Sequence, residues 1–215
     1  PGIRLVYEEA CERSLSCQRN QSLTHVTADV SFMIDDDSLL LPGCVGAVLR
    51  VYEADTERRL GGVELNARAA PESNVNLVAS ARNVSTVRVP FKSLINQKLM
   101  LGGVFEQFVP YEGSYPKWPL SPAVAALPVE PVSFMYGYRM TYWTETIRRV
   151  GFDSDMRQYC LSEDIDASYR ASLLGPLVQA KEAGVYHHQA ASGRINRYAV
   201  CAQRTLNQEL CLRKH

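Results

Sequence analysis

DVSFMIDDDSLLLPG, residues 29–43, joins an apolar run to three consecutive acids. The run 30–34 has no regular alternation of apolar and polar residues, which is typical of a short strand buried on both faces, as in a parallel sheet. Asp35, Asp36 and Asp37 follow it, and ionised carboxylates at this spacing repel one another. The stretch therefore predicts a buried strand whose end carries either a solvated turn or a metal site.

Strands and helices alternate on either side of this stretch, which predicts an α/β fold with a mostly parallel, Rossmann-type sheet flanked by helices. Prolines break up residues 66–131, so we expect an irregular Pro-rich insertion there. Its aromatic residues, which collect at 105–118, suit either packing on the core or an acceptor-binding wall. The elements that we predict are the strands 3–7, 30–34, 60–65, 132–138 and 185–188 and the helices 8–28, 44–54, 144–150, 163–174 and 195–212.

Composition and charge give no support to several classes of protein. The chain has 215 residues, 46% of them hydrophobic, with 23 basic and 23 acidic side chains. A net charge of zero gives no support to nucleic-acid binding or to disorder. The six cysteines form no C-x-x-C pair, so we expect reduced, mostly buried thiols of an intracellular protein. The sequence shows no secretory leader and no apolar run long enough to span a bilayer.

A second group of acids opens a predicted helix in YCLSEDIDASYRA, residues 159–171. Acids in a first turn favour the positive end of the helix dipole, and that alone explains them. The functional interpretation is that one carboxylate acts as a general base in a cleft. Ser162 is the predicted N-cap, and Asp166 and Arg170, four residues apart, suit an ion pair.

Two adjacent histidines stand in GVYHH, residues 184–188. Neighbouring residues of a strand point to opposite faces, so only one of His187 and His188 can easily face a given site. That imidazole is either structural or a ligand of a divalent metal.

Taken in order, these stretches resemble the inverting nucleotide-sugar glycosyltransferases of family 2, which have the GT-A fold. QRNQSLTHVTADVSFMIDDDSLLLPG resembles the family's RN segment and the buried strand that ends in its D-x-D motif. VGFDSDMRQYCLSEDIDASYRASLLG resembles its Gly-Phe-Asp turn, its ED motif and an Arg-bearing helix. VYHH resembles a later strand that can supply a histidine. The resemblance covers roughly residues 1–65 and 130–190.

The resemblance implies a role for each matching residue. Asp35 and Asp37 correspond to the ends of D-x-D and would bind Mn²⁺ or Mg²⁺, while Asp36, between them, would contact the ribose. Arg19 corresponds to an arginine near the nucleotide. The residues implied for the remaining roles are Glu163 and Asp164 at the catalytic step, with Asp164 as the base, His187 or His188 as a further metal ligand, and Arg194 at the diphosphate.

The implied reaction moves a sugar from a nucleoside diphosphate to a hydroxyl of a glycan or lipid-linked glycan. The implied arrangement is the second half of a nucleotide-sugar-binding subdomain at 1–65, the insertion at 66–131 as acceptor region, and an acceptor and catalytic subdomain at 132–215. Many relatives act at the inner face of a membrane, so we expect a cytoplasmic protein, with attachment to that face left open.

One departure from the family keeps other interpretations open. The family's first strands, one of which ends in an Asp that reads the nucleobase, have no counterpart here, which predicts a longer physiological protein, an N-terminal partner segment or a homo-oligomer. A non-catalytic carbohydrate-binding or scaffold fragment is the main alternative. A metal-dependent hydrolase that uses the same acids is a third hypothesis.

Overall fold

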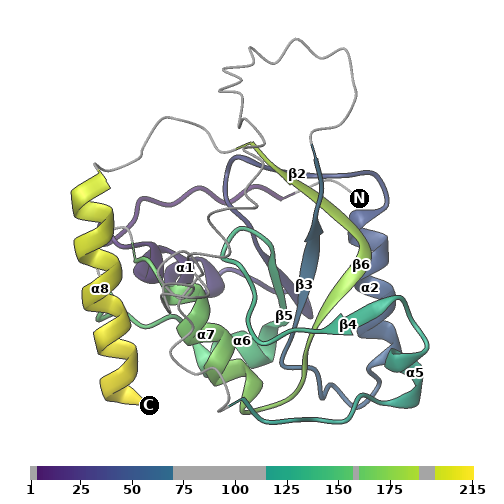
Figure 1. The fold of residues 1–215 in the computed structure, drawn as a ribbon. Helices are drawn as coiled ribbons and strands as arrows, with labels where there is room; N and C mark the ends of the chain where they lie inside the picture. Colours follow the sequence, from purple (N-terminus) through teal and green to yellow (C-terminus); the bar gives the residue numbers. More distant parts are fainter. Residues whose placement is uncertain (1–3, 70–114, 157–159, 189–196) are drawn as a thin grey trace, which may run out of the picture. The chain divides into compact units, whose positions relative to one another are not determined.

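A mixed β-sheet flanked by helices forms the centre of the fold in the computed structural model, which describes residues 4–69, 115–156, 160–188 and 197–215 (Figure 1). The strand order is β1-β5-β3-β6-β2, with β4 paired to β6. The strands are β1 Val30–Met33, β2 Ser38–Leu40, β3 Gly62–Ala67, β4 Val129–Pro131, β5 Met140–Trp143 and β6 Leu177–His187. The helices are α1 Leu15–Leu23, α2 Cys44–Ala54, α5 Pro122–Ala125, α6 Thr144–Val150, α7 Glu163–Ser172 and α8 Arg197–Lys214.

The α/β class is confirmed, but the expectation of a mostly parallel sheet is wrong for the part of the chain that the structure describes. Only β3 and β6 run parallel there, whereas β1–β5, β3–β5, β2–β6 and β4–β6 are antiparallel. The apolar run of β1 has a different cause. Val30 and Phe32 pack against one hydrophobic cluster and Met33 belongs to another, so both faces of the strand are covered. Missing alternation reports this coverage and not the direction of the neighbouring strands.

Two hydrophobic clusters lie on the two faces of the sheet. On one face α2 packs Val48 and Val51 against Val63 and Leu65 of β3, with Val178 of β6 alongside. The other face carries the side chains that alternate with these. They pack with α6 and α7 in a cluster that contains Met33, Met140, Tyr142, Ile147, Ala167, Ala171 and Leu177. The sheet is therefore buried on both sides, and its strand ends are where functional side chains can reach solvent.

The segment 132–138 is a loop, so the predicted strand there is wrong. Its Val132 amide donates to Leu177 O of β6 at 3.0 Å, but the next amides that bond donate to side chains. The nitrogens of Met135, Tyr136 and Gly137 donate to Ser168 Oγ, Glu64 Oε1 and Asp164 Oδ2 at 2.9, 3.0 and 3.0 Å, in that order. The strand that follows begins only at Met140. The aromatic residues that suggested a strand therefore belong to a loop whose amides are bonded by side chains of β3 and α7.

Most of the remaining predicted elements are present near the expected positions, but their lengths differ. The helices predicted at 44–54 and 144–150 are confirmed, and α7 ends at Ser172. The helix predicted at 8–28 is shorter, because Ser14 caps α1 by accepting the Cys17 amide at 3.4 Å. Residues 4–7 form no strand, and β6 begins well before residue 185. The closing helix, predicted at 195–212, spans Arg197–Lys214 as α8.

The thiols and the search for membrane spans complete the comparison. None of the six cysteines is in a disulfide, but only Cys44, Cys160 and Cys211 are buried, so the expectation of mostly buried thiols holds for half of them. Among the described residues, no helix has both the length and the apolar character needed to cross a membrane. The predicted insertion at 66–131 falls largely on residues 70–114, outside the described residues, as does most of the aromatic segment 105–118.

Candidate metal centre and the adjoining acidic pair

The end of β1 and the start of β2 bring two of the three acids to one end of β6. The chain turns within residues 34–37, where the Ser38 amide donates to Asp35 O at 3.0 Å. β2 then pairs with β6 so that Ser38 lies opposite His187, and the His188 amide donates to Asp37 O at 2.9 Å. This register sets Asp37 beside the His187 side chain.

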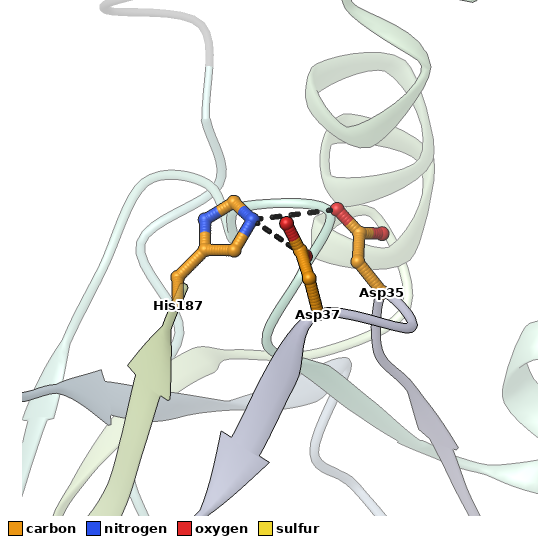
Figure 2. A group of neighbouring side chains, drawn as sticks. All are labelled: Asp35, Asp37 and His187. Carbon is orange, nitrogen blue, oxygen red and sulfur yellow. Dashed lines mark ion pairs between the residues drawn. The ribbon is translucent and has the colours of Figure 1, made fainter. Parts of the chain in front are cut away.

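Asp35, Asp37 and His187 point toward one another (Figure 2). His187 Nε2 lies 3.0 Å from Asp37 Oδ1 and 4.0 Å from Asp35 Oδ2. One ligand atom from each residue falls within 4.8 Å of the other two, so the group can hold a metal ion. Two carboxylate oxygens and an imidazole nitrogen suit Mn²⁺ well and Mg²⁺ less well, because Mg²⁺ prefers oxygen ligands. All three side chains are partly exposed, which leaves room for ligands from a substrate or from water.

Two of the residues implied by the resemblance, His188 and Asp36, lie outside this group. His188 is exposed and its ring faces Tyr186, 6.3 Å between centroids, so His187 is the histidine that faces the acids. Asp36 is exposed and is not part of the group that can hold a metal. Arg194 lies outside the described residues.

Arg19 joins this group to the acidic start of α7. It is only 8% exposed, and its Nη1 donates to Glu163 Oε1 at 2.8 Å. Its Nη2 donates to Gly137 O at 2.9 Å and to Asp35 Oδ1 at 3.3 Å. The two oxygens of Asp35 are thus divided, with Oδ1 on Arg19 and Oδ2 toward His187. One guanidinium therefore fixes the distance between the candidate metal ligands and the acidic pair.

The acidic pair at the start of α7 is held in two different ways. Burial, with the neighbouring Asp164 charge, raises the pKa of Glu163 to about 8, against the opposing effect of Arg19. Asp164 is half-buried, and burial also raises its pKa, although hydrogen bonds from the backbone act against that rise. Its Oδ2 accepts the Gly137 amide at 3.0 Å and its Oδ1 accepts the Ile165 amide at 2.9 Å. A carboxylate with a raised pKa in a fixed position is suited to general-base work.

The turn before α7 has an unusual backbone. Cys160 and Ser162 both have positive φ, at 47° and 80°, although neither is glycine. Ser162 occupies the predicted N-cap position, but its side chain makes no capping hydrogen bond. Left-handed conformations at non-glycine residues cost free energy, so other contacts must hold this turn.

The predicted ion pair of Asp166 with Arg170, further along α7, is confirmed, with Arg170 Nη2 2.5 Å from Asp166 Oδ2.

A second buried charge pair lies beside the acidic pair and was not predicted from the sequence. Glu64 of β3 is 2% exposed, and Arg139 Nε lies 3.0 Å from Glu64 Oε1. Burial raises the pKa of Glu64, while the Arg139 charge opposes that rise. The signal in the sequence was the glutamate in the middle of GGVEL, at a position whose neighbours along the strand are apolar. A charged residue within an apolar strand indicates a partner that the local sequence does not show.

Tyr138 connects the loop 132–138 to the candidate metal ligands. Its ring stacks on the His187 ring, with 4.2 Å between centroids and 22° between planes. Burial raises the pKa of the Tyr138 hydroxyl. The loop therefore contacts the acidic pair through Gly137 and the metal-ligand group through Tyr138.

Comparison with known proteins does not identify this site. No protein-family model matches the chain, and no curated protein matches it. The case for its chemistry therefore rests on the geometry of the residues themselves.

Proposed function

We propose that the chain is a metal-dependent inverting glycosyltransferase with a GT-A-like fold, which moves a sugar from a nucleoside diphosphate to a hydroxyl acceptor. The observation that carries the proposal is that Arg19 bonds to both Asp35 and Glu163, so that the candidate metal ligands and the acidic pair form one site. These acids are far apart in the sequence, and neither group alone supports the reaction.

The donor half of the proposal uses Asp35, Asp37 and His187. A divalent ion bound there would offset the negative charge that grows on the departing diphosphate. Arg19 supplies a fixed positive charge beside Asp35 and holds one of its oxygens. Asp36 is exposed next to the group and is free to accept hydrogen bonds from donor hydroxyls. Arg194 stays a proposed diphosphate contact from the resemblance alone.

The acceptor half uses Asp164. Its carboxylate would take the proton of the attacking hydroxyl. Glu163 would stay bonded to Arg19 and orient the Arg19 guanidinium. Attack on the side of the anomeric carbon opposite the diphosphate gives inversion, and holding the two reactants in line supplies much of the rate. Gly137 fixes the carboxylate by its amide, so the base needs no rearrangement before it acts.

The experiment compares Asp164→Asn and Asp37→Asn with the unmodified chain. Calorimetry with uridine and guanosine diphosphates, with and without Mn²⁺, measures donor-side binding, and release of the diphosphate from the matching sugar nucleotides measures transfer. We expect Asp37→Asn to lose metal-linked nucleotide binding. Asp164→Asn should keep that binding and lose turnover. Near-normal turnover in Asp164→Asn would remove the base from its role.

Two other outcomes would replace the proposal. Glycan binding without metal-linked nucleotide binding would favour a carbohydrate-binding or scaffold module. Cleavage of the sugar nucleotide without any acceptor would favour a hydrolase that uses the same acids.

A further inference from the structure

We propose that Glu64 and Arg139 are positioning residues that hold the loop Met135–Tyr138 between the two halves of the site. The inference rests on the proposed function for its meaning, since it names what aligns the metal ligands with the acidic pair. Neither residue touches Asp35, Asp37 or His187 in any contact of the described residues. Their effect would pass through the loop, which joins the two halves.

Glu64 holds the loop from the sheet. Its Oε1 accepts the Tyr136 amide at 3.0 Å, and its Oε2 accepts Gln179 Nε2, from the parallel neighbour β6, at 2.7 Å. Both contacts fix the carboxylate at a position of β3 that is paired on both sides, with Met140 of β5 and Gln179 of β6. The Tyr136 amide therefore has one fixed acceptor.

Arg139 closes the loop on its other side. Its Nε is 3.0 Å from Glu64 Oε1, but the N–H is not directed at that oxygen, so within the described residues it is buried without a hydrogen-bond acceptor. The guanidinium carbon lies 4.5 Å from the centre of the Tyr136 ring and 5.3 Å from that of Tyr138. Arg139 thus restrains the rings at both loop positions by cation–π contact.

The loop passes this restraint to both halves of the site. The Gly137 amide donates a hydrogen bond to Asp164, and the Gly137 carbonyl accepts one from Arg19. A shift of the loop would therefore move the candidate base Asp164 and Arg19 together. Tyr138 lies flat against the His187 ring, so the same shift changes the direction of Nε2. Ring orientation decides whether an imidazole can coordinate a metal.

Stability alone does not explain this pair. Burying a glutamate and an arginine costs desolvation free energy, which their attraction offsets only in part. Met140, which lies directly opposite Glu64 on β5, is a fully buried apolar residue, and an apolar pair would suit the same environment. What an apolar pair lacks is an acceptor for the Tyr136 amide and a cation for the two rings.

The test measures loop position without activity. In nuclear magnetic resonance spectra, the His187 ring protons report stacking by Tyr138, and the Gly137 amide proton reports its bond to Asp164. Manganese titration by calorimetry gives the metal affinity. Glu64→Leu removes both the acceptor and the charge, whereas Glu64→Gln keeps an acceptor for Tyr136 and removes only the charge.

We expect Glu64→Leu to move both resonances toward unstacked and unbonded values and to weaken Mn²⁺ binding about tenfold, as loss of an outer-shell contact does. Glu64→Gln should lie between it and the unmodified chain. The matched control is Asp55→Asn. Asp55 is also buried and accepts two loop amides, those of Arg59 and Leu60, but it lies at the C-terminal end of α2. Asp55→Asn should lower stability and leave the His187 ring protons, the Gly137 amide proton and the Mn²⁺ affinity unchanged.

Unchanged resonances and unchanged Mn²⁺ affinity in folded Glu64→Leu would overturn the inference. If Glu64→Leu does not fold, unchanged resonances in Glu64→Gln would do so. Failure of the unmodified chain to bind Mn²⁺ would instead overturn the proposed function, and the two resonances would still decide whether Glu64 positions the loop.

Discussion

Arg19 Nη1 lies 2.8 Å from Glu163 Oε1, although 144 positions separate the two residues in the chain. Both side chains are more than nine-tenths buried. The pair connects α1 to the start of α7 and lies between the candidate metal ligands and the candidate base. Its energetics therefore decide how the site responds to substitution and to pH.

Loss of the arginine should destabilise the fold in a pH-dependent way. Arg19→Met leaves Glu163 buried without its cation, and breaking a buried ion pair costs about 3 kcal/mol. That cost grows as the pH rises above 8, since Glu163 beside Arg19 has a pKa of about 8 and takes up a proton below it. Urea unfolding at pH 5 and pH 9 should therefore show the larger loss at pH 9.

The matched control is Arg50→Met. Arg50 pairs with Glu182 at 2.9 Å, but both side chains are more than half exposed. Its loss should change the free energy of unfolding by less than about 1 kcal/mol at either pH. A loss for Arg19→Met no larger than this would contradict a buried pair.

Glu163 itself should make the protein less stable as the pH rises. Its pKa in the folded state is raised from 4.5 to about 8, so the folded chain holds the proton more tightly than the unfolded chain. The stabilising contribution is complete below about pH 4.5 and is lost as the pH rises to about 8. Glu163→Gln cannot titrate, so its stability should fall less across this range. Parallel pH profiles for the two proteins would show that the pKa is not raised.

Metal binding should distinguish the two histidines. His187→Gln removes one of three candidate ligands, whereas His188→Gln removes an exposed ring that faces Tyr186. A ligand that binds only the folded state stabilises it by about 2.7 kcal/mol at one hundred times its dissociation constant. We therefore expect Mn²⁺ to raise the thermal midpoint of the unmodified chain and of His188→Gln, and not that of His187→Gln. Equal shifts in both variants would place the metal elsewhere.

A single methyl group at Gly137 should disturb the buried pair. A Cβ there would lie 3.1 Å from Glu163 Oε1 and 3.3 Å from Arg19 Nη2, closer than side chains normally pack. Gly137→Ala should destabilise by about 1–2 kcal/mol, as overpacking does. In Gly46→Ala the Cβ meets, among the described residues, only Arg50 Nη1, at 3.8 Å, so this change within α2 should stabilise by about 0.5–1 kcal/mol. Thermal unfolding of both variants checks that stability falls in Gly137→Ala and rises in Gly46→Ala.

The sequence predicted what depends on neighbouring residues. The end of β1 at the acids, the extent of α2 and the stop of α6 at Gly151 follow from apolar runs and from Gly and Pro, and the structure has them at these places. That only one of His187 and His188 would face the acids also followed from strand alternation, but the choice depended on the pairing of Ser38 with His187.

Long-range contacts could not be predicted in this way. The loop 132–138 looks like a strand because its apolar and aromatic residues suit one. Yet the amides of residues 135–137 bond to Ser168, Glu64 and Asp164, none of them a neighbour in sequence. The prediction of a mostly parallel sheet was wrong for a related reason. An apolar strand reports that both its faces are covered, and helices cover both faces of this sheet whichever way its strands run.

The left-handed turn at Cys160 and Ser162 bears on the order in which the site is completed. Asn207 of α8 donates to Leu161 O, between these two residues, at 2.8 Å. During synthesis α8 emerges after the strands and after α7, so the turn that orients Glu163 and Asp164 lacks this contact until residue 207 has been made. We expect the acidic pair to reach its final position later than the strands do. Asn207→Ala should then speed hydrogen exchange at the Glu163 amide and leave exchange in β3 unchanged, whereas equal protection at Glu163 would separate α8 from this step.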